Sequence, residues 1–102
     1  MVLLEMSIVP MGCGESVSQY VAQCVDLIDQ SGLAYEVHSM GTIVEGELDE
    51  VLGLMQRCIE KLAENADRVT CSAKLDFRRG AGGRLTAKGD SVEQKLGRPV
   101  RR

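Results

Sequence analysis

The chain has 102 residues and a mass of 11.1 kDa, which is enough for one domain and excludes two. Its composition, 44% hydrophobic and 26% charged with 3% aromatic residues, excludes intrinsic disorder and predicts a small core of aliphatic side chains. The net charge of −3 divides into −9 for residues 1–77 (4 basic, 13 acidic) and +6 for residues 78–102 (8 basic, 2 acidic). The small core and this asymmetry favour subunit association.

The first half of the chain predicts a strand, a helix and a hairpin. Residues 2–8 alternate between apolar and mixed side chains, as in a strand with one buried face, and Pro10 ends the strand. A helix is predicted from Ser16, a good N-cap, until Gly32 stops it. Residues 33–38 and 42–45 then form two short strands that can pair as a hairpin.

The second half predicts another helix and the longest strand. Residues 47–66 have an acidic first turn and one apolar face, and residues 69–78 alternate strictly. A flexible loop is predicted at about 80–87 and a short C-terminal helix at about 90–97, while Arg101 and Arg102 are expected to fray.

The element order is β-α-β-β-α-β over a single domain, residues 1–102. This order predicts an α+β, ferredoxin-like fold: a four-stranded antiparallel sheet with two helices on one face, plus the short C-terminal helix. The strand at 42–45 is ambiguous, because Ile43 and Val44 are both apolar and point to opposite faces. The polar residues predicted on the open face are Glu5, Ser7, Glu36, His38, Thr70, Ser72, Lys74 and Asp76.

The cysteines and the N-terminus argue against metal and membrane sites. The four cysteines form no C-x-x-C pair and His38 is the single histidine, so no metal site is expected. Cys24, Cys58 and Cys71 fall at apolar positions, which predicts buried thiols. No apolar run reaches the ~20 residues of a membrane span, so no membrane partner is expected and a cytoplasmic location is predicted.

Few residues could support catalysis. No G-x-S-x-G motif accompanies the lone imidazole of His38, so no catalytic residue is predicted. The glycines at 12 and 14 suit a tight turn better than a phosphate loop. Glu45, flanked by apolar residues, leaves two alternatives: a buried carboxylate that binds a cationic or amidine-like ligand, or one that faces solvent or pairs with Lys74 or Arg78.

The basic C-terminal tail keeps a second function class open. It has no interleaved aromatic residues and no helix-turn-helix or zinc-finger spacing, which disfavours nucleic acid as a partner. A module that binds a polyanion or another protein through this tail remains the alternative.

Several separate motifs together resemble the small thiamine-binding protein family, in order and over nearly the whole chain. They are VPMG at 9–12, SVSQYV at 16–21, HSMGT at 38–42, EGELDEV at 45–51, DRV at 67–69, KLD at 74–76 with RR at 78–79, and Lys88 with SVE at 91–93. The resemblance implies a ferredoxin-like fold, homodimers that pair into tetramers through their sheets, and binding of thiamine or its hydroxymethylpyrimidine part without catalysis and without a cofactor.

The same resemblance implies a set of ligand-binding residues. Glu45 would be the anchoring acceptor, and Tyr20 or Tyr35 could stack on the ligand ring. An enzyme of thiamine salvage that uses His38 or Glu45 as a base is a further alternative. The implied site residues are Ser16, Ser18, Tyr20, His38, Met40, Gly41, Thr42, Glu45, Asp76 and Arg78.

Overall fold

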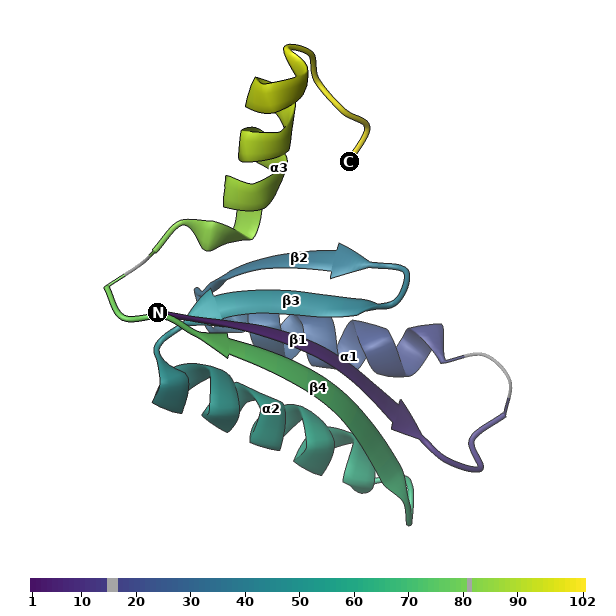
Figure 1. Ribbon diagram of the computed structural model, residues 1–102. Coiled ribbons are helices and arrows are strands. Elements are labelled where there is room, and N and C mark those ends of the chain that lie inside the picture. The colour runs from purple at the N-terminus through teal and green to yellow at the C-terminus, as the bar shows by residue number, and fades with distance from the viewer. Residues whose placement is uncertain (15–16, 81) are drawn as a thin grey trace.

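The computed structural model describes residues 1–14, 17–80 and 82–102, which form four strands and three helices (Figure 1). The predicted order of the first six elements is confirmed. The elements are β1 (Val2–Pro10), α1 (Ser18–Gln30), β2 (Ala34–His38), β3 (Gly41–Gly46), α2 (Leu48–Ala63), β4 (Val69–Phe77) and α3 (Arg84–Leu96).

The strands form one antiparallel sheet in the order β2-β3-β1-β4. Helices α1 and α2 lie side by side on one face of it (Figure 1). The predicted ferredoxin-like fold is therefore confirmed. Strand β1 occupies the centre because its alternate apolar residues are all buried beneath the two helices.

The core lies between this face of the sheet and the two helices. Helix α2 begins with a capping box, in which Glu50 accepts a hydrogen bond from the backbone N–H of Glu47 at 2.9 Å. Its apolar stripe then packs on β1, as the spacing predicted. The buried core residues are Val2, Leu4, Met6, Ile8, Cys24, Ile28, Val44, Val51, Leu54, Cys58 and Leu62.

Strand register resolves which way β3 faces. Thr42 is paired with Met6 and Glu45 with Leu3, so Thr42 faces the helices and Glu45 faces the open side. The polar residues that alternation predicted on the open face share that side with Glu45.

Helix α3 differs from the prediction. It begins at Arg84, so residues 84–87 are helical rather than part of a loop. The local pattern hides this start because its N-cap, Gly83, has a left-handed φ of 65° and the carboxylate that binds the first turn comes from β3. The predicted fraying of Arg102 is also wrong, because its guanidinium binds Asp90 at 2.6 Å and Glu93 at 2.7 Å.

Helix α3 stands away from the rest of the molecule (Figure 1). None of its residues is buried. The radius of gyration is 15.0 Å, whereas a compact chain of this length has about 13 Å. Among the described residues, no helix combines the length and the apolar character needed to cross a bilayer.

Candidate ligand-binding site

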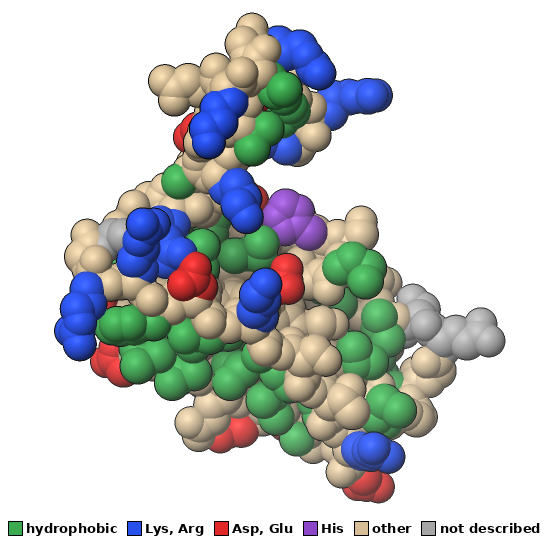
Figure 2. Space-filling model, viewed as in Figure 1, with side chains coloured by type: hydrophobic (Ala, Val, Ile, Leu, Met, Phe, Trp, Pro, Cys, Tyr) green, Lys and Arg blue, Asp and Glu red, His purple; other side chains and the backbone are tan. Residues whose placement is uncertain are grey.

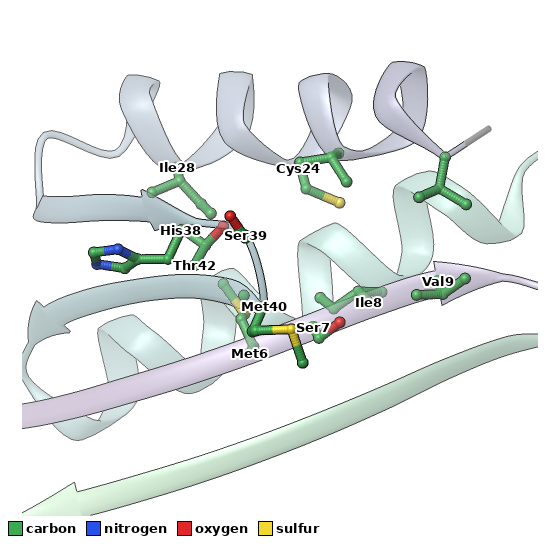
Figure 3. A pocket seen from close by; sticks show the side chains of 13 residues that line it. Met6, Ser7, Ile8, Val9, Cys24, Ile28, His38, Ser39, Met40 and Thr42 are labelled. Atoms are coloured by element: carbon green, nitrogen blue, oxygen red, sulfur yellow. The ribbon is translucent and has the colours of Figure 1, made fainter.

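A cavity of about 140 Å³ lies where α1 crosses the end of β1 and the β2–β3 turn (Figure 3). Because α1 is joined to β1 and the turn follows β2, the fold brings three separate segments to this corner. The lining residues are Met6, Ser7, Ile8, Val9, Val17, Val21, Cys24, Ile28, His38, Ser39, Met40, Gly41 and Thr42.

Thr42 supplies a polar group to a mostly apolar wall. It is 8% exposed and faces the helices. Its hydroxyl makes no hydrogen bond within the described residues, so it is free to bond with an occupant. The cavity therefore combines aliphatic walls with an unused hydroxyl, as small-molecule sites do.

The β2–β3 turn supplies three of the predicted site residues beside Thr42. Met40 is 86% exposed, and Gly41 follows it at the start of β3. The imidazole of His38 projects away from the cavity (Figure 3), with its Nε2 3.1 Å from a carboxylate oxygen of Glu36. The structure thus places His38, Met40, Gly41 and Thr42 in the lining of one cavity.

Ser18 and Tyr20, the predicted site residues that belong to α1, are not in the lining of this cavity. Ser18 is exposed in the first turn of the helix, and Ser16 lies outside the described residues. Tyr20 packs against the core. The hydroxyl of Tyr35 donates a hydrogen bond to Asp29 at 2.9 Å, which raises the pKa of the phenol.

Glu45 lies elsewhere and holds α3. Only 6% of it is exposed, and its carboxylate accepts hydrogen bonds from the backbone N–H groups of Gly83 at 3.1 Å and Arg84 at 2.8 Å. A carboxylate is favourable at a helix N-terminus because it meets free N–H groups and the positive end of the helix dipole. Of the two alternatives for Glu45, burial is right and solvent exposure, or pairing with Lys74 or Arg78, is wrong.

Asp76 and Arg78 line a second hollow, between α3 and the adjoining end of the sheet. Its volume is about 530 Å³. Asp76 forms an ion pair with Arg84. Basic side chains gather on α3 and on the part of the sheet below it (Figure 2). The residues lining this hollow are Leu3, Asp76, Arg78, Arg84, Ala87, Lys88, Ser91, Val92 and Lys95.

Sequence reasoning missed the apolar walls of the first cavity. Val21, Cys24 and Ile28 lie on α1 and Val17 is its N-cap residue, and all four have the apolar character of core residues. The sequence did contain a signal for these walls, because apolar residues near the start of α1 must lie over the end of β1. Alternation alone does not tell a filled core position from the wall of a cavity.

The sequence model of a protein family that is described as thiamine-binding protein matches residues 4–93 of this chain. The chain belongs to the thiamine-binding protein family. The match confirms the resemblance drawn from the motifs.

Several relatives are similar over nearly the whole chain. A UPF0045 protein of Mycobacterium bovis is 36% identical over 99 residues, covering 96% of this chain and 97% of the relative. A crystal structure of a Methanocaldococcus jannaschii protein is similar with a TM-score of 0.82 and 33% identity, covering 91% of this chain and 96% of that one. A Bacillus cereus domain of unknown function is similar with a TM-score of 0.75 and 32% identity, covering 85% of each chain.

Proposed function

We propose that this chain binds thiamine without transforming it, and that the cavity beside the β2–β3 turn takes the aminopyrimidine ring. The membership of the thiamine-binding family supports the ligand class. The observation that carries the site is the unused Thr42 hydroxyl in a cavity of about 140 Å³. Sites for whole drug-sized molecules have about 300–1,000 Å³, so this one suits a single ring.

The chemistry of the walls fits that ring. Aliphatic side chains of α1 and β1 can cover its two faces, and the Thr42 hydroxyl can donate to a ring nitrogen or accept from the exocyclic amine. The cationic thiazolium then stays outside, where the net charge of −9 on residues 1–77 favours it. Hydroxymethylpyrimidine alone should therefore bind nearly as well as thiamine.

Isothermal titration with thiamine and, separately, with hydroxymethylpyrimidine tests this site. Thr42→Val keeps the shape and removes the hydroxyl, so we expect about tenfold weaker binding, the loss of one hydrogen bond of about 1.4 kcal/mol. Thr70→Val, at an exposed position of β4, is the matched control and should bind as wild type does. Equal affinity of both variants would exclude this cavity.

Two further measurements test the other roles considered for Glu45 and for the protein. If the ligand binds in the cavity beside the β2–β3 turn, Glu45→Gln should leave its affinity unchanged, because Glu45 is not in the lining of that cavity. Recovery of unchanged thiamine after long incubation with the protein is expected. Turnover to thiamine fragments would instead support a salvage enzyme.

Self-association is part of the proposal, with a second copy of the chain as the partner. Strand β4 is a nine-residue edge strand, and unpaired edges of this length are usually covered. Exposed apolar side chains gather along this edge and the neighbouring helix (Figure 2). They are Leu48, Leu52, Leu75 and Phe77. Pairing of such dimers through their open sheet faces would give a tetramer and bury the apolar residues of α3.

Light scattering tests the β4 edge with two matched substitutions. Phe77 and Val37 are about half exposed, at 51% and 50%, on opposite edge strands. Phe77→Asp should lower the oligomer mass, because it places a charge in the apolar interface. Val37→Asp should leave the mass unchanged. The β4 interface is wrong if both variants keep the wild-type mass.

The basic hollow beside α3 favours a second candidate function, binding of an anionic partner. Arg84, Lys88 and Lys95 follow one another on one face of α3 and meet Arg78 across the hollow. With heparin as a model polyanion, the logarithm of the association constant should fall linearly with the logarithm of the salt concentration. Lys88→Glu should weaken binding further, whereas Lys61→Glu, on α2, should not. Salt-independent binding would reject this candidate.

A further inference from the structure

Two buried thiols face each other between α1 and α2. Cys24 comes from α1 and is 8% exposed, and Cys58 comes from α2 and is 0% exposed. The Cys58 thiol donates to the backbone carbonyl of Cys24 at 3.8 Å. The pair lies in the contact between the two helices.

The cavity gives one of these thiols access to solvent. Cys24 lines it, with its sulfur between α1 and the Ile8 region of β1 (Figure 3). Cys58 is not in the lining. A reagent small enough to enter the cavity therefore reaches Cys24 first. The other two thiols, Cys13 and Cys71, are half-buried and lie outside this wall.

The closeness of the two thiols makes them chemically different. Interaction with Cys58 lowers the pKa of Cys24, against the opposing effect of burial. The same interaction, together with burial, raises the pKa of Cys58. The thiolate, which is the nucleophilic form, is thus favoured at the sulfur that the cavity exposes.

We propose that Cys24 is an oxidation site reached through the cavity, and that Cys58 resolves it to a disulfide joining α1 and α2. The oxidant is a hydroperoxide. The Cys24 thiolate attacks one peroxide oxygen, so an S–O bond forms, the O–O bond breaks, and alkoxide or hydroxide leaves and takes up a proton. Two thiols and one hydroperoxide thus give one disulfide, one alcohol (or water) and one water.

The second step is helped by the first. Oxidation of Cys24 to a sulfenic acid changes the group whose interaction raises the pKa of Cys58 most. Cys58 can then lose its proton and attack the Cys24 sulfur. The S–S bond forms, the S–O bond breaks, and water leaves. The two electrons given up by the sulfurs have gone to the peroxide.

Mass spectrometry of the protein after treatment with hydrogen peroxide tests this. In a Cys13→Ser/Cys71→Ser background we expect loss of two hydrogen atoms and a peptide cross-link between Cys24 and Cys58. Adding Cys58→Ser should leave a sulfenic acid that dimedone captures at Cys24. Adding Cys24→Ser instead should slow oxidation of Cys58 by about tenfold or more. Rapid oxidation of Cys58 without Cys24, or no disulfide in the parent, would overturn the proposal.

Protection by a bound ligand extends the test and rests on the proposed function. Saturating thiamine or hydroxymethylpyrimidine should slow the oxidation of Cys24, because the ring fills the route to its sulfur. If the disulfide forms at the same rate with ligand present, the ligand does not occupy this cavity. The cross-link between Cys24 and Cys58 would then still support the oxidation proposal. A failure of the ligand site can therefore be distinguished from a failure of the oxidation site.

Discussion

Replacing Glu45 with alanine will release α3 from the sheet while the core stays folded. The carboxylate binds two N–H groups at the start of α3, and bonds of this charged kind contribute about 1.5–3 kcal/mol each. Because α3 has no buried residue, these bonds and the ion pair between Arg84 and Asp76 are its main attachments among the described contacts. Losing the equivalent of one such bond raises local opening of the helix by about 10- to 150-fold.

Hydrogen–deuterium exchange followed by peptide mass spectrometry measures this opening. Amides of α3 should exchange faster in Glu45→Ala, and to a smaller extent in Glu45→Gln, which keeps an acceptor without the charge. Amides of α2 should not change. Glu5→Ala, an exposed carboxylate on the same face of the sheet, is the control. Wild-type exchange of α3 in Glu45→Ala would show that other contacts hold the helix.

Replacing Leu54 with alanine will destabilise the whole domain. Leu54 is 0% exposed in the middle of α2, and shortening such a residue costs about 2–5 kcal/mol in transfer energy and cavity formation. Small domains have a total stability of about 5–15 kcal/mol. The substitution therefore removes a large share of it.

Urea unfolding followed by circular dichroism checks the size of this effect. The matched control is Leu52→Ala, on the same helix but 40% exposed, which should cost about 1 kcal/mol or less of unfolding free energy. The ratio between the two losses matters more than either value, because both variants make the same change of side chain and its effect on the unfolded chain is similar in each. Similar losses at both positions would contradict the placement of the core.

Periodicity predicted the fold because each of its signals is local. The alternation of residues 2–8 and 69–78 and the apolar stripe of α2 each require only neighbours along the chain. The open face was likewise predicted correctly for β1, β2 and β4. Strand β3 could not be assigned, because Ile43 and Val44 are both apolar and pairing with β1 decides the face.

The site was only partly predictable, for two physical reasons. The bond between Glu45 and Arg84 joins residues 39 positions apart, so no local pattern contains it. It also accounts for the early start of α3, which composition had suggested to be a loop. The cavity walls, such as Cys24 and Ile28, have the same apolar character as core residues, and only the three-dimensional packing shows the gap that they leave.

The central place of β1 has a consequence for the time course of folding. Strand β1 ends at Pro10, whereas one of its partners, β4, ends at Phe77. At the usual ~5–20 residues per second, a ribosome needs about 3–13 seconds to make the residues between these two ends. During this interval the alternating apolar residues of β1 have no complete sheet to join. Folding during synthesis therefore depends on delayed, long-range pairing, and β1 is exposed to aggregation until β4 has been made.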